Sequence, residues 1–220
     1  MIKELILLAV SKKYGRYCVA GVDRYTGEWY RLVSHDSTAH YALSERQIRL
    51  TNNELAQKLD IVHVSVYDKA ISYFQTENYL ISAGYTWEKV GVADIDEVRT
   101  VHPPDQSEYL FYDTQSSLAK MYYKNLSVNE ISSLMLISVP NAIVQIRELG
   151  NSRKVKIKLI YKEREYEPLA VTDLEFLSLC EQLKPGDYPI RKEGIMLLSV
   201  GECYEKNNRH YKLIAGIMLK

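Results

Sequence analysis

The stretch from Ile2 to Ser34 decides the fold class, because it holds three short apolar runs separated by two polar turns. The runs read Ile2-Lys-Glu-Leu-Ile-Leu-Leu-Ala-Val10, Tyr17-Cys-Val-Ala-Gly-Val22 and Trp29-Tyr-Arg-Leu-Val-Ser34. The turns between them, Ser11-Lys-Lys-Tyr-Gly-Arg16 and Asp23-Arg-Tyr-Thr-Gly-Glu28, each contain a glycine. This pattern predicts three antiparallel strands in meander order.

The same stretch carries cations and flat rings at its turns and strand ends. Cations neutralise phosphates and rings stack on bases, so their combination on a small sheet predicts a nucleic-acid surface. An ordinary exposed strand face is an equally good interpretation, because Tyr and Trp are common in strands. In a regular strand Trp29 and Arg31 share one face, and Tyr30 points the other way, toward the core. The candidate binding residues here are Lys12, Lys13, Tyr14, Arg16, Tyr17, Trp29 and Arg31.

The second half of the chain also alternates apolar and polar residues. Lys154, Lys156 and Lys158 lie on one face of a predicted strand whose other face is apolar. This row is either a solvated face that protects a sheet edge or a second cationic surface. Lys212, near the start of the last predicted strand, joins the same candidate set. Pro140 marks a bulge or an edge in the long apolar run 136–147.

Both halves share one outline of several short strands with a small helix late in the unit. The helix of the second half follows a capping box, Thr172-Asp-Leu-Glu175, and is predicted to run to about residue 183. Short strands with such turns predict a mainly β chain of two small barrels, residues 1–130 with a helical insertion and residues 131–220. A single β-sandwich with helical insertions is the structural alternative.

Composition sets further bounds on the chain. Of its 220 residues, 46% are hydrophobic and 25% are charged, which is ordinary for a globular protein. The formal net charge is zero, with an acidic middle over residues 77–113, which weakens a simple electrostatic argument for nucleic acid. The three cysteines are far apart, which favours a reducing, cytoplasmic setting over a disulfide framework. Apolar runs are too short to predict a membrane span.

The sequence offers little that predicts catalysis. The five histidines have no spacing typical of a metal site, and motifs for a P-loop, a dinucleotide fold or a serine nucleophile are absent. Carboxylates such as Asp94, Asp96 and Glu97 stand at a predicted helix start, where acidic residues are favoured anyway. We therefore expect a protein that is not an enzyme and uses no metal or cofactor.

Motifs at the two ends of the chain resemble a known family. Residues 11–22, Thr26-Gly-Glu-Trp-Tyr-Arg31, Leu197-Leu-Ser-Val-Gly-Glu-Cys-Tyr204 and His210-Tyr-Lys-Leu-Ile-Ala-Gly-Ile217 are similar to the bacterial dual OB-containing domain family. Leu32 and Cys203 stand where that family typically has proline. The resemblance implies two tandem OB-like barrels that bind nucleic acid, RNA or single-stranded DNA, or a nucleotide-like ligand, in a bacterial conflict or defence setting.

Two other functions stay open at this point. A protein-interaction module, partnering an effector encoded nearby, would present a contiguous apolar and tyrosine-rich patch instead of a basic groove. An enzyme acting on a nucleotide would need a pocket with perturbed acid or base groups, and the sequence names none.

Overall fold

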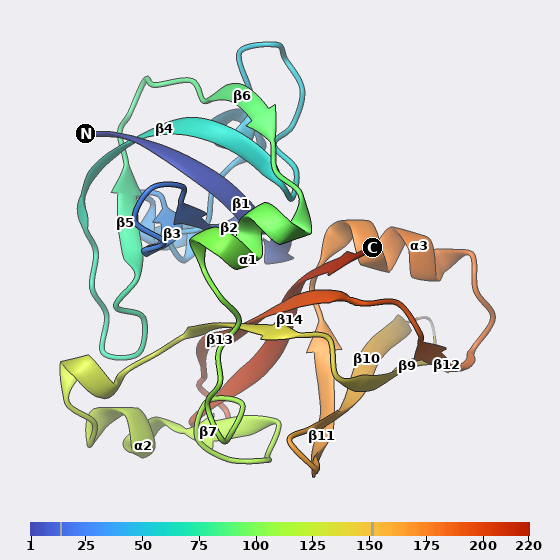
Figure 1. Cartoon of the computed structure of the whole chain (residues 1–220). Coiled ribbons are helices and arrows are strands. Elements are labelled where there is room, and N and C mark those ends of the chain that lie inside the picture. The colour runs from blue at the N-terminus through green and yellow to red at the C-terminus, as the bar shows by residue number, and fades with distance from the viewer. Residues whose placement is uncertain (14, 151) are drawn as a thin grey trace. The chain divides into compact units, whose positions relative to one another are not determined.

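The computed structural model describes residues 1–13, 15–150 and 152–220, and most of its regular structure is strand. The chain splits into two compact units, Met1–Pro103 and Pro104–Lys220, whose elements are labelled in Figure 1. The division lies upstream of the predicted boundary at residue 130. It does so because β7 (Ser117–Ala119) pairs with β14 (Arg209–Leu219), which ties the intervening segment to the second unit.

The first unit is a closed five-stranded barrel. Its strands pair in the circuit β1-β2-β3-β5-β4 and back to β1, with β3 and β5 parallel and the other pairs antiparallel. The predicted meander over Ile2–Ser34 is confirmed as β1, β2 and β3. The elements are β1 (Ile2–Lys13), β2 (Arg16–Asp23), β3 (Trp29–Val33), two 3-10 turns (Ser37–Ala39, Glu45–Ile48), β4 (Asp60–Lys69), β5 (Asn78–Ile81), β6 (Glu88–Val92) and α1 (Ile95–Val101).

One long strand closes this barrel. Leu5 and Ile6 of β1 pair with β2 along one edge of the strand and with β4 along the other. β1 therefore joins the two ends of the curled sheet and closes the barrel. A bulge between Leu7 and Ala9 accompanies the bend. Gly21 of β2 lies so close to β1 that an added Cβ would be 2.3 Å from the Ile6 carbonyl oxygen. Glycine is therefore required there by the close approach of two backbones.

The second unit repeats this circuit with its first strand in two pieces. Its strands pair in the order β9-β10-β11-β14-β13-β8, again with one parallel pair, β11 and β14. β8 and β9 are consecutive and separated by Val139 and Pro140, so the apolar run 136–147 forms two strands and the proline marks the break between them. The elements are β7, α2 (Lys120–Lys124), a 3-10 turn (Val128–Glu130), β8 (Leu134–Ser138), β9 (Asn141–Leu149), β10 (Ser152–Tyr161), β11 (Arg164–Val171), α3 (Leu174–Glu181), β12 (Gly186–Ile190), β13 (Gly194–Tyr204) and β14.

The helix α3 stands between the third and fourth strands of this circuit. Its N-cap is Asp173 rather than the predicted Thr172, because the Asp173 carboxylate accepts a hydrogen bond from the Phe176 amide at 3.1 Å. The second oxygen of Asp173 accepts the Ile217 amide at 2.7 Å. One buried carboxylate thus caps the helix and also binds it to the last strand.

Residues 104–117, which we call the strap, begin the second unit and lead into β7, whose first residue is Ser117. Two buried tyrosines of the sheet hold the strap. The Tyr161 hydroxyl donates to the Ser107 carbonyl at 2.9 Å, and the Leu110 amide donates to the Tyr166 hydroxyl at 3.0 Å. The strap is therefore fastened through polar groups that the barrel would otherwise bury without partners.

Candidate nucleic-acid interface

The predicted residues around the first turn lie in different environments. Lys12 is exposed, with its Nζ 5.5 Å from the centre of the Tyr17 ring, and Tyr17 itself is buried. Arg16 is half-buried and its guanidinium lies 3.7 Å from the Asp36 carboxylate. Tyr14 and the side chain of Lys13 fall outside the described residues. The ring of Tyr17 is therefore part of the barrel wall and is not available to stack on a base.

The three residues that begin β3 are largely enclosed. Tyr30 is buried, as its strand parity predicts, and it stacks on Tyr79 with ring centres 4.2 Å apart. Trp29 is half-buried and meets the His102 ring edge-on at 4.5 Å. Arg31 was predicted to share an exposed face with Trp29, but only 9% of it is exposed. Among the described residues of β3, Tyr30 and Arg31 are thus enclosed and Trp29 is half-buried against His102, so they do not form an exposed row of rings and guanidinium groups.

Lys212 also lies away from the surface where the sequence prediction placed it. Its side chain is fully buried, and its Nζ donates to the Asp113 carboxylate at 2.7 Å and the Asp113 carbonyl at 2.6 Å. Burial lowers the pKa of the Lys212 ammonium, and the Asp113 carboxylate partly offsets that shift. Lys212 therefore fastens the strap to β14, and its buried ammonium is not accessible to a ligand at the surface.

The three lysines of β10 do share one outer face. Val155, Ile157 and Leu159, which alternate with them, are buried. Lys154 and Lys156 are exposed, and Lys158 is half-buried with its Nζ 2.7 Å from Glu165. We call Lys154, Lys156 and Lys158 the lysine strip. Consecutive members of one strand face lie about 6.6 Å apart, which is comparable to neighbouring phosphates in an extended strand of nucleic acid.

Neighbouring strands extend the cationic surface on one side only. Lys154 pairs in register with Arg147 of β9, whose guanidinium lies 2.5 Å from Asp187 of β12. On the other side, β11 presents the carboxylates of Glu165 and Glu167. Hydrogen bonds from Ser116 lower the pKa of Glu167, and the charges of Arg209 and Lys156 lower it further. The cationic surface is therefore bounded by Glu165 and Glu167 toward β11, and toward β12 it continues through Arg147, whose charge is paired with Asp187.

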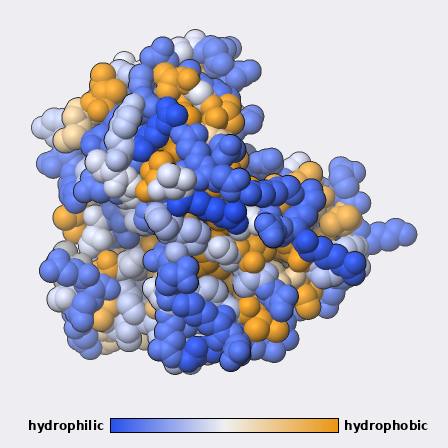
Figure 2. All heavy atoms as spheres, viewed as in Figure 1, coloured by the Kyte–Doolittle hydropathy of each residue, from blue (hydrophilic) through white to orange (hydrophobic). Residues whose placement is uncertain are grey.

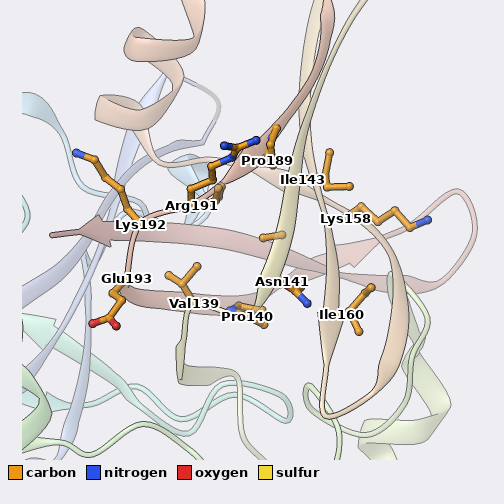
Figure 3. A pocket seen from close by; sticks show the side chains of 12 residues that line it. Val139, Pro140, Asn141, Ile143, Lys158, Ile160, Pro189, Arg191, Lys192 and Glu193 are labelled. Atoms are coloured by element: carbon orange, nitrogen blue, oxygen red, sulfur yellow. The ribbon is translucent and has the colours of Figure 1, made fainter.

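A groove opens at the Lys158 end of the strip, and Figure 3 shows its lining. Its volume is about 810 Å³. The floor is apolar, because Ile143 and Ile160 project outward and are 39% and 43% exposed. Arg191 and Lys192, which follow β12, supply two exposed cations at the opposite rim. We call this the β9–β12 groove.

Sequence reasoning missed three cations of this surface, namely Arg147, Arg191 and Lys192. The lysine strip was found because its period is local to one strand. The other three reach the same face through the pairing of β9 with β10 and of β12 with β9, and a single sequence gives no signal for that pairing. The surface thus has six cations, the lysine strip and these three. Within residues 1–13, 15–150 and 152–220, four of the six form no ion pair: Lys154, Lys156, Arg191 and Lys192.

Other kinds of site find less support. Across the described part of the chain, no three His, Cys, Asp or Glu side chains gather in a way that could hold a metal ion. None of its helices is both long enough and apolar enough to span a membrane. On the face seen in Figure 2, hydrophobic residues occur in small groups between hydrophilic ones. A broad apolar docking patch is thus not what this face presents.

Comparisons with known proteins bear on the fold. A family model described as "Dual OB-containing domain" matches residues 3–217. The crystal structure of the p204 HINb domain is 10% identical over 97% of this chain and 96% of that chain, with a TM-score of 0.38. The Ifi202 HINa domain in complex with 20-bp dsDNA is 10% identical over 100% and 95%, with a TM-score of 0.30. The search of curated proteins gave no match.

Proposed function

Because the chain belongs to the dual OB-containing domain family, we propose that it binds single-stranded nucleic acid, RNA or DNA, on the outer face of β9 and β10. OB barrels bind many ligands, so the surface has to support the function. The observation that supports it is the lysine strip together with Arg191 and Lys192. Lys154 and Lys156 lie on the outer face of β10, and Arg191 and Lys192 follow the end of β12; all four are exposed and form no ion pair within the described chain.

This surface differs in kind from the one expected of the first unit. Its exposed groups are ammonium and guanidinium groups, with isoleucines in place of rings. Phosphate neutralisation releases counterions and is largely independent of base sequence. The proposal is therefore phosphate-dominated binding with little sequence preference. From the family resemblance we also propose a bacterial defence setting. The separated cysteines support a proposed cytoplasmic location, and the lack of catalytic motifs in the sequence supports a proposed role without catalysis.

The test compares binding in rising salt. Fluorescence anisotropy would follow a labelled oligouridylate and an oligothymidylate of about 12 nucleotides, a length within the site sizes of OB folds. Replacing Lys154 and Lys156 with glutamine should reduce the slope of log K against log salt by about 1.4, at roughly 0.7 per lost phosphate contact. The matched control is Lys124→Gln/Lys206→Gln, which removes two exposed lysines outside the strip.

The outcomes distinguish the assigned face from other surfaces of the second unit. An unchanged slope in the control, with a reduced slope in the strip variant, supports the assigned face. The reverse result would move the interface to α2 or to the loop between β13 and β14. Absence of binding to both oligomers at low salt, or binding that is insensitive to salt, would refute nucleic-acid binding by this surface.

A further inference from the structure

The β9–β12 groove has a chemistry of its own, distinct from the lysine strip that leads into it. Ile143 and Pro189 pair in register across β9 and β12, and Lys158 pairs with Ile143 from the other side. In Figure 3, Pro189 and Ile143 accordingly lie between Arg191 and Lys158. An apolar floor is thus flanked by a cation on each side.

The separation of those cations suggests what lies between them. Lys158 and the strand that precedes Arg191 are two strand spacings apart, which is roughly 10 Å. A ligand that satisfies both ends needs negative charge at two points with an uncharged, largely apolar body in the middle. Asn141, exposed at the same end of the sheet, adds an amide that can donate and accept hydrogen bonds at the edge of that body.

We propose that the groove holds one nucleobase of the bound strand, with its flanking phosphates at Lys158 and at Arg191 and Lys192. This inference rests on the proposed nucleic-acid function and assigns a specific position within it. The base lies on Ile143, Ile160 and Pro189, and the phosphodiester chain continues along Lys156 and Lys154. Glu193, on the remaining rim, repels further phosphates and leaves the lysine strip as the path out of the groove.

An acidic peptide is the competing occupant, and the shape of the surface favours the nucleic acid. Carboxylates on a peptide would suit the cations, yet a strand of nucleic acid supplies the alternation of charge, flat body and charge at fixed covalent spacing. The lysine strip adds a further cation at every second residue of β10, about 6.6 Å apart, where phosphates farther along the same strand of nucleic acid can bind. The groove and the strip therefore form one continuous track for a phosphodiester chain.

The experiment separates the base from the backbone. Anisotropy would compare an oligouridylate of about 12 nucleotides with an oligomer of equal length and charge in which every sugar lacks a base. The parent protein should bind the base-bearing oligomer roughly fivefold more tightly, as expected if about 40 Å² of apolar surface leaves water. In the Ile143→Ser/Ile160→Ser variant this ratio should fall to about one, with affinity for the abasic oligomer unchanged.

The control is Leu149→Ser/Leu179→Ser, which removes two exposed leucines of the same unit outside the groove. It should keep the parent ratio. Equal binding of both oligomers by the parent protein would overturn the base site while leaving the proposed function intact. A ratio that survives in the isoleucine variant, equal losses with both oligomers, or equal competition by polyglutamate would also overturn it. If neither oligomer binds the parent protein, the proposed function itself fails.

Discussion

Replacing Asp113 with alanine should destabilise the second unit far more than replacing its partner Lys212 with methionine. The two side chains form one ion pair, but their surroundings are unequal. The Lys212 side chain is fully buried, whereas 42% of the Asp113 side chain is exposed. Removing Asp113 leaves a buried ammonium without its counter-ion. Removing Lys212 lets a carboxylate return to water and puts an apolar chain of similar length in the buried space.

The magnitude follows from this asymmetry. Breaking a buried ion pair by removing one partner costs about 3–5 kcal/mol. The exposure of Asp113 weakens the pair, and its backbone carbonyl, 2.6 Å from Lys212 Nζ, remains after the substitution. We therefore expect Asp113→Ala to lower the free energy of unfolding by roughly 2 kcal/mol, and Lys212→Met by less than about 1 kcal/mol. The double variant should resemble Lys212→Met, because no buried charge is left.

The loss of unfolding free energy in Asp113→Ala should also depend on pH, and the burial of Lys212 sets the direction of that dependence. Burial holds the folded-state pKa of Lys212 below the unfolded value of 10.5. Between those two values the unfolded chain binds more protons, so the free energy of unfolding rises with pH across that window. Asp113 raises the folded pKa of Lys212, so its removal extends the window to lower pH. The deficit of Asp113→Ala relative to the parent should therefore shrink in alkaline solution.

Urea denaturation at several pH values, followed by circular dichroism, measures these differences as shifts in midpoint at constant slope. Equal costs for the two single substitutions would contradict the unequal burial of the pair, as would an Asp113→Ala variant within about 0.5 kcal/mol of the parent, the range of a neutral surface change. A deficit that grows with rising pH would also contradict the assigned sign.

Two further stability predictions rest on backbone contacts. Tyr166→Phe removes the oxygen that accepts a hydrogen bond from the buried Leu110 amide. We expect the free energy of unfolding, measured by urea denaturation, to fall by about 1–3 kcal/mol. A change near zero would mean that the strap does not depend on this hydrogen bond. Gly21→Ala forces a methyl group against the Ile6 carbonyl and should cost about 1–3 kcal/mol. Gly91→Ala should cost less, because its added Cβ would lie 3.3 Å from the nearest side-chain atom of Ile61 and not against a backbone oxygen. Equal shifts in melting temperature would contradict the close approach of β2 to β1.

Much of the fold could be predicted because its signals are local. The three runs of Ile2–Ser34 became β1, β2 and β3, and the lysine alternation of residues 154–158 became part of β10. The closing of the barrel, by contrast, depends on β1 pairing with β4 across many intervening residues. The strap has no local signal either, because its partners Tyr161 and Tyr166 lie far along the chain.

The candidate site shows the same division between local and distant signals. Alternation placed Lys158 on an outer face, but nothing local distinguished it from Lys212, which also stands on a strand. The difference is Asp113, 99 residues earlier in the chain, which draws Lys212 into a buried pair. A single sequence cannot show such a partner. Similarly, parity placed Tyr30 in the core and could not show that Arg31 is also enclosed.

Pro189 has one more consequence, for how the sheet of the second unit ends. Within the described residues β12 pairs with β9 alone, so its other side is the free edge of a sheet, where another chain could add as an extra strand. A proline there has no N–H to offer, and the exposed Asp187 two residues earlier places a charge beside it. The edge is thereby protected from strand-to-strand aggregation, and the floor beside Ile143 stays open to small or extended ligands without inviting a neighbouring sheet.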